Sequence, residues 1–368
     1  MALQPEPGAA HVNPRCPHFG ACGGCTLQHW RDDAYIDWKT RQLADALHRA
    51  GYAHAVIAPA GRTEPGVRRR MDLAARRRGG KIVLGLHRLR SAEVVDLVEC
   101  HVLHPALVAL FAPLRALLAR LAALRREGSV IANLLDNGAD VLLRTDAPLE
   151  LADRMALTEF ARVHALPRIA WARGKDAPEP VAILRPPMIA FHGVRVTPPP
   201  GAFLQASASG EAAIIAAVLG ALSGGGHIAE LFAGCGSLTF GLARQARVTA
   251  WEGDAASVAA VRATTNQTGL SGRVTVTQRD LARQPLQAKD LSGFTAVVLD
   301  PPFAGAAAQT VQIGAARVPI VVYVSCNPAT LSRDAGLLAK AGYRLLSATP
   351  IDQFLWSERL ESVCVFQC

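Results

Sequence analysis

The sequence has no apolar run long enough to cross a membrane, so an integral membrane protein is not expected. Its first fifteen residues, MALQPEPGAAHVNPR, lack the cationic patch and the apolar core of a secretory signal peptide. Charged residues are sparse, at 19% of the chain, whereas apolar residues make up 50%, which argues against long disordered stretches. These absences predict a globular, cytoplasmic protein.

Lysine is scarce, with 5 lysines against 34 arginines, yet the net charge is still +9. A basic excess favours a polyanion such as RNA as the partner, although an arginine-rich composition can also follow from the base composition of a genome. Two runs, VRRRM at 67–71 and ARRRGGK at 75–81, place basic side chains on adjacent strands of one predicted hairpin. This hairpin is either an RNA-binding surface or a solvated face.

Three cysteines and three glycines are clustered in CPHFGACGGC, residues 16–25. In a cytoplasmic protein, clustered cysteines point to a metal site or to catalysis rather than to disulfides. The segment is too polar for core, which disfavours a set of buried, reduced thiols. Spacing alone does not distinguish a zinc site with four cysteines from an iron–sulfur cluster.

The 368 residues divide by pattern into three parts. Residues 1–48 hold the cysteine cluster and an amphipathic helix. Residues 49–197 predict a small antiparallel sheet, one long helix over 105–128, a hairpin turn at Asn137–Gly138 and further α/β elements. Residues 198–368 alternate strands with helices, which predicts a doubly wound, mostly parallel, Rossmann-like sheet and therefore an α/β fold.

A glycine-rich turn in ELFAGCGSLTFGLA, residues 230–243, follows an apolar strand and precedes a helix. Glycines there let the backbone approach a ligand, but the third glycine of a dinucleotide site is missing, which disfavours a nicotinamide cofactor. Glu252 ends the next strand, where a carboxylate can accept ribose hydroxyls, and Asp280 after the third strand is placed to meet an adenine. These features predict S-adenosylmethionine, the alternative being a structural turn with a surface glutamate.

Two further strands end in VVLDPPF and VYVSCNPATL. Their prolines stiffen the turns that carry Asp300 and Asn327, so both side chains should face one crevice at the carboxyl edge of the sheet. Cys326 lies in the same segment. A cysteine in such a place is either an apolar filler or a nucleophile, and the polar setting of Ser-Cys-Asn-Pro favours the nucleophile.

A thiol is chemically useful to a methyltransferase whose target is C5 of uracil. That carbon is a poor nucleophile until a thiolate adds at C6 and converts the ring to an enolate. After C5 has taken the methyl group, a base must remove the C5 proton before the thiol leaves. Glu361 is the predicted base, with Glu358 as the local competitor.

The segments CPHFGACGGCTLQH, ELFAGCGS, LDPPFAGA and SCNPATLSRD, with the closing glutamate, resemble the RNA uracil-C5 methyltransferase family, which makes 5-methyluridine in ribosomal and transfer RNA. The likeness implies that Cys326 is the nucleophile and that Glu361 is the proton acceptor. It also implies a methyl-donor pocket lined by Gln205, Phe232, Ser237, Glu252, Asp280 and Asp300.

The ribosomal-RNA branch of this family holds a [4Fe–4S] cluster, and the resemblance implies that Cys16, Cys22, Cys25 and Cys100 are its ligands. A zinc ion stays open as the alternative. The expected substrate is RNA, ribosomal RNA (23S) rather than transfer RNA, and the expected state is a monomer. Fifteen residues before Cys16 are too few for the N-terminal TRAM β-barrel of some members, so none is expected.

The chain departs from the family pattern at several positions. Serine replaces asparagine at Ser207 and Ser237, and Phe303 stands where the family has a basic residue. The closing motif, usually F-P-x-T-x-H before x-Glu, reads FLWSERLE, so that Leu355, Ser357 and Arg359 differ. Two alternatives remain, an N-methyltransferase for an exocyclic amine, which needs no thiol, and a non-catalytic RNA-binding relative.

Overall fold

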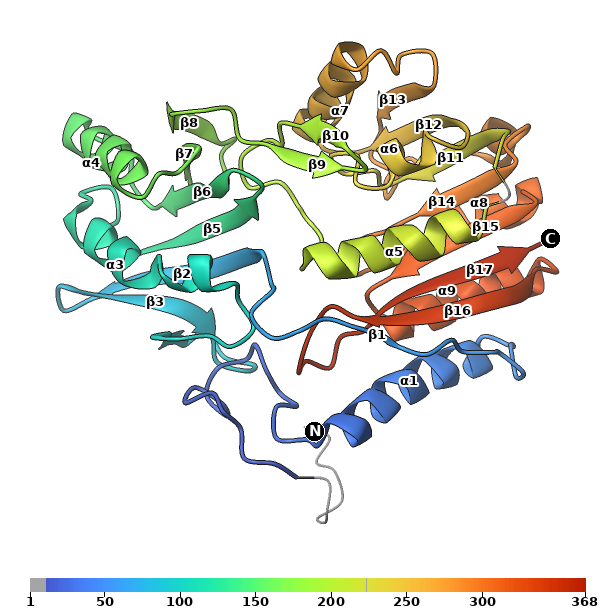
Figure 1. The fold of residues 1–368 in the computed structure, drawn as a ribbon, viewed down its shortest axis with the longest axis horizontal. Helices are drawn as coiled ribbons and strands as arrows, with labels where there is room; N and C mark the ends of the chain where they lie inside the picture. The colour runs from blue at the N-terminus through green and yellow to red at the C-terminus, as the bar shows by residue number, and fades with distance from the viewer. Residues whose placement is uncertain (1–10, 223) are drawn as a thin grey trace.

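The computed structural model describes residues 11–222 and 224–368. Figure 1 shows two large β-sheets that lie side by side, one built from the first half of the chain and one mainly from the second half. Within the described residues, no helix is both long enough and apolar enough to cross a bilayer.

The first large sheet has seven strands in the order β4-β3-β2-β5-β6-β7-β8, and it packs against three helices. Its strands are β2 (Arg70–Arg78), β3 (Lys81–His87), β4 (Val94–Asp96), β5 (Glu127–Leu135), β6 (Gly138–Thr145), β7 (Arg168–Arg173) and β8 (Glu179–Ile183). The helices are α2 (Pro105–Val108), α3 (Phe111–Arg120) and α4 (Leu151–Val163). A separate two-stranded sheet follows, β9 (Ile189–Phe191) with β10 (Val194–Val196).

The second large sheet has the order β1-β16-β17-β15-β14-β11-β12-β13. Its strands are β1 (Gly61–Arg62), β11 (His227–Leu231), β12 (Arg247–Glu252), β13 (Val274–Gln278), β14 (Ala296–Leu299), β15 (Ile320–Ser325), β16 (Arg344–Asp352) and β17 (Glu361–Gln367). Five neighbouring strands, from β15 to β13, run parallel, and β17 is antiparallel to both of its neighbours. The predicted doubly wound, Rossmann-like sheet is therefore confirmed.

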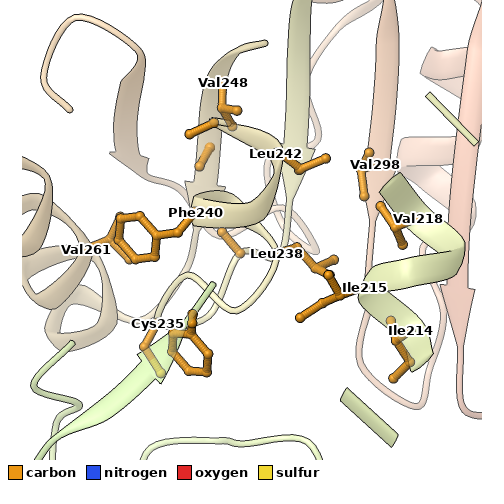
Figure 2. Close-up of a cluster of buried hydrophobic side chains, with 14 of the residues drawn as sticks. Ile214, Ile215, Val218, Cys235, Leu238, Phe240, Leu242, Val248, Val261 and Val298 are labelled. Atoms are coloured by element: carbon orange, nitrogen blue, oxygen red, sulfur yellow. The ribbon is translucent and has the colours of Figure 1, made fainter. Parts of the chain in front are cut away.

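Helices cover both faces of this second sheet because its strands are apolar on both sides. Val298 and Val322 face a core that includes α5 (Ala208–Gly220), α6 (Thr239–Leu242) and α7 (Ala255–Gln267), part of which is shown in Figure 2. The preceding residues, Val297 and Val321, face the opposite core, which includes α1 (Asp32–Arg49), α8 (Ala307–Ala316) and α9 (Pro328–Lys340). A short 3-10 helix, Ala288–Leu291, precedes β14.

The helix behind the cysteine cluster packs on the second sheet. Leu43 and Leu47 of α1 are buried in the same core as Leu338 of α9, and β1 extends the sheet by pairing with β16. The chain therefore adds α1 and β1 to the second sheet before it forms the first one, and Figure 1 shows this helix in blue beside β16.

The predicted long helix over 105–128 is wrong. The chain forms α2 and α3 instead, turns to an extended conformation at Leu121, and is already in strand β5 at Glu127. The Arg77 side chain donates hydrogen bonds to four carbonyl oxygens at this end of α3, those of Leu118, Ala119, Leu121 and Leu124. A tertiary contact thus satisfies the terminal carbonyls, which no local pattern could reveal.

The remaining expectations for the first sheet hold in part. The predicted hairpin is present, but its turn is Asp136–Asn137, one residue earlier than predicted, since Leu135 pairs with Gly138 across it. The small antiparallel sheet proves to be larger and mixed, because β6 and β7 are parallel and are joined through α4. The crossover helix α4 is what a parallel pair of strands requires.

The basic side chains of the β2–β3 hairpin are divided between structural and exposed positions. Arg69 is buried, where it pairs with Glu211 of α5 at 2.6 Å, and Arg77 ends α3. Arg78 and Lys81 are exposed at the hairpin tip. Arg69 therefore links the first sheet to α5 of the second, whereas Arg77 serves the first sheet alone, and only part of the positive charge of this hairpin is exposed.

Candidate active site

The glycine-rich turn lies between β11 and α6, at the carboxyl edge of the second sheet. Gly236 has a φ of +94°, and a Cβ there would lie 2.6 Å from the Phe240 ring, so only glycine fits. Phe232 also has positive φ, at +65°. The turn packs on the apolar core shown in Figure 2. Cys235, which belongs to the turn, is buried in that core as an apolar side chain.

Glu252 is joined directly to this turn. One carboxylate oxygen accepts a hydrogen bond from the Gly234 amide at 2.8 Å, and the other accepts one from the Asp254 amide at 2.8 Å. Ser237 ends the same turn, half-buried. Asp280 lies after the neighbouring strand β13, exposed, where it accepts bonds from the amides of two residues that follow it. The structure thus brings Phe232, Ser237 and Glu252 together, with Asp280 one strand away.

A chain of hydrogen bonds connects the half-buried carboxylate of Asp300 to the buried carboxylate of Glu361 through two glutamines. Gln205 donates to Asp300 at 2.8 Å, and Gln353 donates both to the Gln205 side-chain oxygen and to Glu361, each at 2.7 Å. The backbone amide of Ala206 donates to the side-chain oxygen of Gln353 at 3.1 Å. The second oxygen of Glu361, Oε1, is buried and has no hydrogen-bond partner within the described residues.

Burial raises the pKa values of both carboxyl groups, and the charge of Asp300 raises the pKa of Glu361 further. The hydrogen bond from Gln353 acts in the opposite direction and lowers the pKa of Glu361. A carboxylate that is desolvated in this way is a stronger base than one in water. Glu358 is exposed. Glu361, rather than Glu358, therefore has the surroundings of a general base.

Cys326 is half-buried and lies between β15 and α9. It directly precedes Asn327, whose side chain caps the N-terminus of α9. Burial, together with the charges of Glu361 and Asp300, raises the pKa of its thiol to about 12, whereas the charge of Arg359 lowers it. All three charged side chains are therefore near enough to act on the thiol. The strand ends at Asp300 and Cys326 meet at one edge, as their sequence positions predicted.

A buried ion pair holds the segment that leads to Glu361. Lys39 of α1 pairs with Asp352 at the end of β16, and both side chains are fully buried. Tyr35 donates to the same carboxylate at 2.7 Å and accepts from the Trp356 amide at 2.8 Å. Lys39 also donates to the Phe354 carbonyl at 3.1 Å. Helix α1 therefore fixes the closing loop, residues 353–360, on which the position of Glu361 depends.

Gln353 and the Lys39–Asp352 pair are the parts of the site that sequence reasoning missed. A lysine on the buried stripe of an amphipathic helix, four residues after Tyr35 and four before Leu43, was a signal for a buried ion pair. No comparable signal existed for Gln353. Its partners lie 148 and 8 residues away in sequence, and only the folded chain brings them together.

The four cysteines predicted as ligands line a single cavity of about 480 Å³. Burial raises the pKa values of Cys16, Cys22 and Cys25, that of Cys25 to about 12, and the thiolates raise one another's pKa values. Mutual repulsion of this kind is relieved by a bound cation. In the described part of the chain, however, no three His, Cys, Asp or Glu side chains lie close enough to hold one metal ion, so no preformed zinc site is present.

The cysteine cavity shares a wall with the closing loop. Phe354, Leu355, Ser357 and Arg359 line it from that side. The amides of Thr26 and Leu27, just after Cys25, both donate to the Trp356 carbonyl at 2.9 Å. The cysteine segment and the segment carrying the predicted base are therefore one packed unit.

Comparison with known proteins agrees with this geometry. The family model of tRNA (uracil-5-)-methyltransferases matches residues 197–367. The chain is 40% identical over 366 residues to an uncharacterized RNA methyltransferase of Brucella melitensis, covering 99% of this chain and 86% of the relative. It is 33% identical to the 23S rRNA (uracil(1939)-C(5))-methyltransferase RlmD of Bordetella bronchiseptica, covering 98% of this chain and 81% of the relative.

Among solved structures, the tRNA (uracil-54, C5)-methyltransferase of Pyrococcus abyssi, crystallised with S-adenosyl-L-homocysteine, superposes with a TM-score of 0.68. That similarity covers 94% of this chain and 86% of the other at 20% identity, and it shows the fold. The two curated relatives carry the functional conclusion, because their identity extends over nearly the whole chain. This chain belongs to the RNA (uracil-5-)-methyltransferase family and is an RNA methyltransferase.

Proposed function

We propose that this enzyme transfers a methyl group from S-adenosylmethionine to C5 of a uridine in 23S ribosomal RNA through a covalent adduct between Cys326 and C6. The observation that carries the proposal is that the adjacent ends of β15, β14 and β17 carry Cys326, Asp300 and Glu361, with the Oε1 atom of Glu361 buried and without a hydrogen-bond partner in the described part of the chain. An unpaired, desolvated carboxylate oxygen is suited to accept a proton from carbon.

The proposed reaction has three steps, which are addition of the thiol, methyl transfer and elimination. The Cys326 thiol gives its proton to solvent water and its sulfur bonds to C6 of uracil, while the electron pair of the C5–C6 double bond moves into the enolate. C5 then takes the methyl group, leaving S-adenosylhomocysteine. Glu361 removes the proton from C5, the C5–C6 double bond re-forms and the C6–sulfur bond breaks. Arg359 favours the thiolate at the first and last steps, because its charge lowers the pKa of Cys326.

The methyl donor is proposed to lie across the glycine-rich turn. Glu252 would accept hydrogen bonds from the ribose hydroxyls, and Asp280 would meet the adenine at the end of the next strand. Phe232 and Ser237 line the turn itself, while Gln205 and Asp300 lie at the junction with the uridine site. The support is the common edge of the sheet on which all of these residues lie.

Ribosomal RNA is the proposed substrate because the RlmD relative is similar over nearly the whole chain. Mapping of 5-methyluridine in RNA from a strain that lacks this protein tests both the reaction and the target. We expect one 23S position to lose its methyl group while transfer RNA is unchanged. Loss from transfer RNA alone would refute the ribosomal target, and an unchanged map of both RNAs would refute the proposal.

The cysteine cavity is proposed to hold a [4Fe–4S] cluster that stabilises the cysteine segment and the closing loop. A cubane is bound through four thiolates, in keeping with the four cysteines that line this one cavity. Protein purified without oxygen should be brown and contain about four iron atoms and about four sulfides per chain.

Two cysteine variants test the ligand assignment. Cys25→Ser should remove the colour and lower the melting temperature, because three thiolates cannot hold the cluster firmly. Cys368→Ser is the matched control, since Cys368 is exposed and lies outside the cavity. Stoichiometric zinc without sulfide in the wild-type protein would contradict the cluster.

Gln353→Leu tests the hydrogen bond that positions Glu361. The base acts in its ionised form, and loss of the donor raises the pKa of Glu361, so activity should appear at higher pH than in the wild type. A hydrogen bond to a charged group is worth about 1.5–3 kcal/mol, which predicts at least a tenfold loss at neutral pH that is partly recovered in alkali. Gln267→Leu, at an exposed position, is the control. A pH–rate profile identical to that of the wild type would refute the role.

A further inference from the structure

Two positions at which this chain departs from the family pattern are in contact. Phe303 stands where the family has a basic residue, and Arg359 stands where it has histidine. In the folded chain the guanidinium carbon of Arg359 lies 5.0 Å from the centre of the Phe303 ring. A cation and a flat ring are thus paired at this place, with the cation on the closing loop and the ring on the turn after β14.

The pair is held beside the reacting thiol. The Phe303 carbonyl accepts a hydrogen bond at 3.0 Å from the side chain of Asn327, the residue that follows Cys326. The charge of Arg359 also acts on the Cys326 thiol. Phe303 therefore belongs to a fixed turn at the entrance to the site, and its position does not depend on the packing of its own ring.

The Phe303 ring remains open to solvent although one side is covered by the guanidinium. Its exposed fraction is 53%, which is large for a phenylalanine. No carboxylate in the described part of the chain forms an ion pair with Arg359, and its side chain is exposed as well. A flat apolar surface and an uncompensated positive charge thus lie next to the point at which a target base must enter.

Building on the uridine-C5 reaction proposed above, we propose that Phe303 and Arg359 form a stacking platform for the nucleobase adjacent to the target uridine. A uridine can reach Cys326 only after it leaves its base stack, so its neighbour in the RNA loses a stacking partner. The Phe303 ring replaces that partner. The Arg359 guanidinium, held over the ring, lies within reach of the phosphate between the two nucleotides and favours the splayed backbone.

The platform is tested by replacing the ring in three ways. The probe is total RNA from a strain that lacks the protein, methylated by the full-length enzyme with labelled methyl donor, with the concentration of RNA varied. Phe303→Ala and Phe303→Leu should each raise the KM for RNA by about tenfold, because both lack a flat face. Phe303→Trp should keep a KM well below that of the leucine variant. The KM for the methyl donor should not change in any of them.

Leucine is the decisive variant, because it preserves apolar volume without a stacking surface. Equal KM values for the wild type and the leucine variant, or equal values for the tryptophan and leucine variants, would overturn the platform. Leu346→Ala, at an exposed position on β16, is the control for loss of an exposed apolar side chain and should leave the KM for RNA unchanged. Thermal melting of every variant separates misfolding from loss of binding.

A reciprocal exchange tests the pairing itself. Phe303→Arg places two guanidinium groups in contact and removes the ring, so RNA methylation should fall sharply. Adding Arg359→His to that variant restores the family residues at both positions and should recover part of the loss. Additive effects of the two substitutions would overturn the pairing. If the wild-type enzyme itself forms no 5-methyluridine, the proposed function fails; if it does and the variants behave like it, only the platform fails.

Discussion

Replacing Cys326 with alanine is expected to abolish methyl transfer, with a loss of several orders of magnitude in kcat, because C5 of uracil cannot attack a methyl group unless C6 carries the sulfur. RNA binding should be retained, since the thiol is small and the surrounding carboxylates and Arg359 are unchanged. The measurement is label transfer from the methyl donor to RNA. In parallel, a transcript containing 5-fluorouridine should form a gel-stable adduct with the wild-type protein only.

The matched control is Cys364→Ala. Cys364 is fully buried in β17, so its replacement removes a thiol from the same sheet without touching the site. That variant should still form the adduct, at the cost of a lower melting temperature from the small cavity it leaves. Methyl transfer by the Cys326→Ala protein would refute the thiol mechanism and support an exocyclic-amine N-methyltransferase. RNA binding without any transfer by the wild type would support a non-catalytic relative.

Replacing Glu361 with glutamine is expected to stop the reaction one step later. The amide keeps the shape of the side chain, and its carbonyl oxygen can still accept the hydrogen bond from Gln353. It cannot take the C5 proton, so the methylated adduct should persist and turnover should fall by about 10²- to 10⁴-fold. The label from the methyl donor should then migrate with a protein–RNA band that survives denaturation.

Glu358→Gln is the control for this prediction, because Glu358 is exposed three residues earlier in the same loop. It should turn over at the wild-type rate and accumulate no labelled band. Normal turnover by the Glu361→Gln protein would show that another group removes the proton, and Asp300 would be the nearest candidate by charge.

The two expected phenotypes differ because the residues act on opposite sides of methyl transfer. Without Cys326 no bond to RNA forms, whereas without the Glu361 carboxylate the bond forms and is not released. The hydrogen-bonded connection from Asp300 to Glu361 does not use the side chains at which the closing motif differs from the family pattern. Gln353 and the Lys39–Asp352 pair hold this loop from within, and Leu355 adds a buried apolar contact.

The α/β fold and the edge of the sheet that carries the site could both be predicted from the pattern of residues. Apolar strands that alternate with helices form a parallel sheet, and residues that follow such strands gather at one edge. Glu252, Asp300 and Cys326 could therefore be placed from their positions alone. Glu361 was found through the chemistry that the thiol requires, and its burial distinguishes it from Glu358.

Which side chains meet across the loops could not be predicted in this way and depends on the folded chain. The Lys39–Asp352 pair joins residues 313 positions apart, Arg77 ends a helix 41 residues away, and Phe303 contacts Arg359 from a different turn. Each contact depends on the path of an irregular segment, which is set by the packing of complete sheets and helices and leaves no periodic trace in the sequence. Strand ends are positioned by a repeating local geometry, whereas loop contacts are positioned by everything the loop packs against.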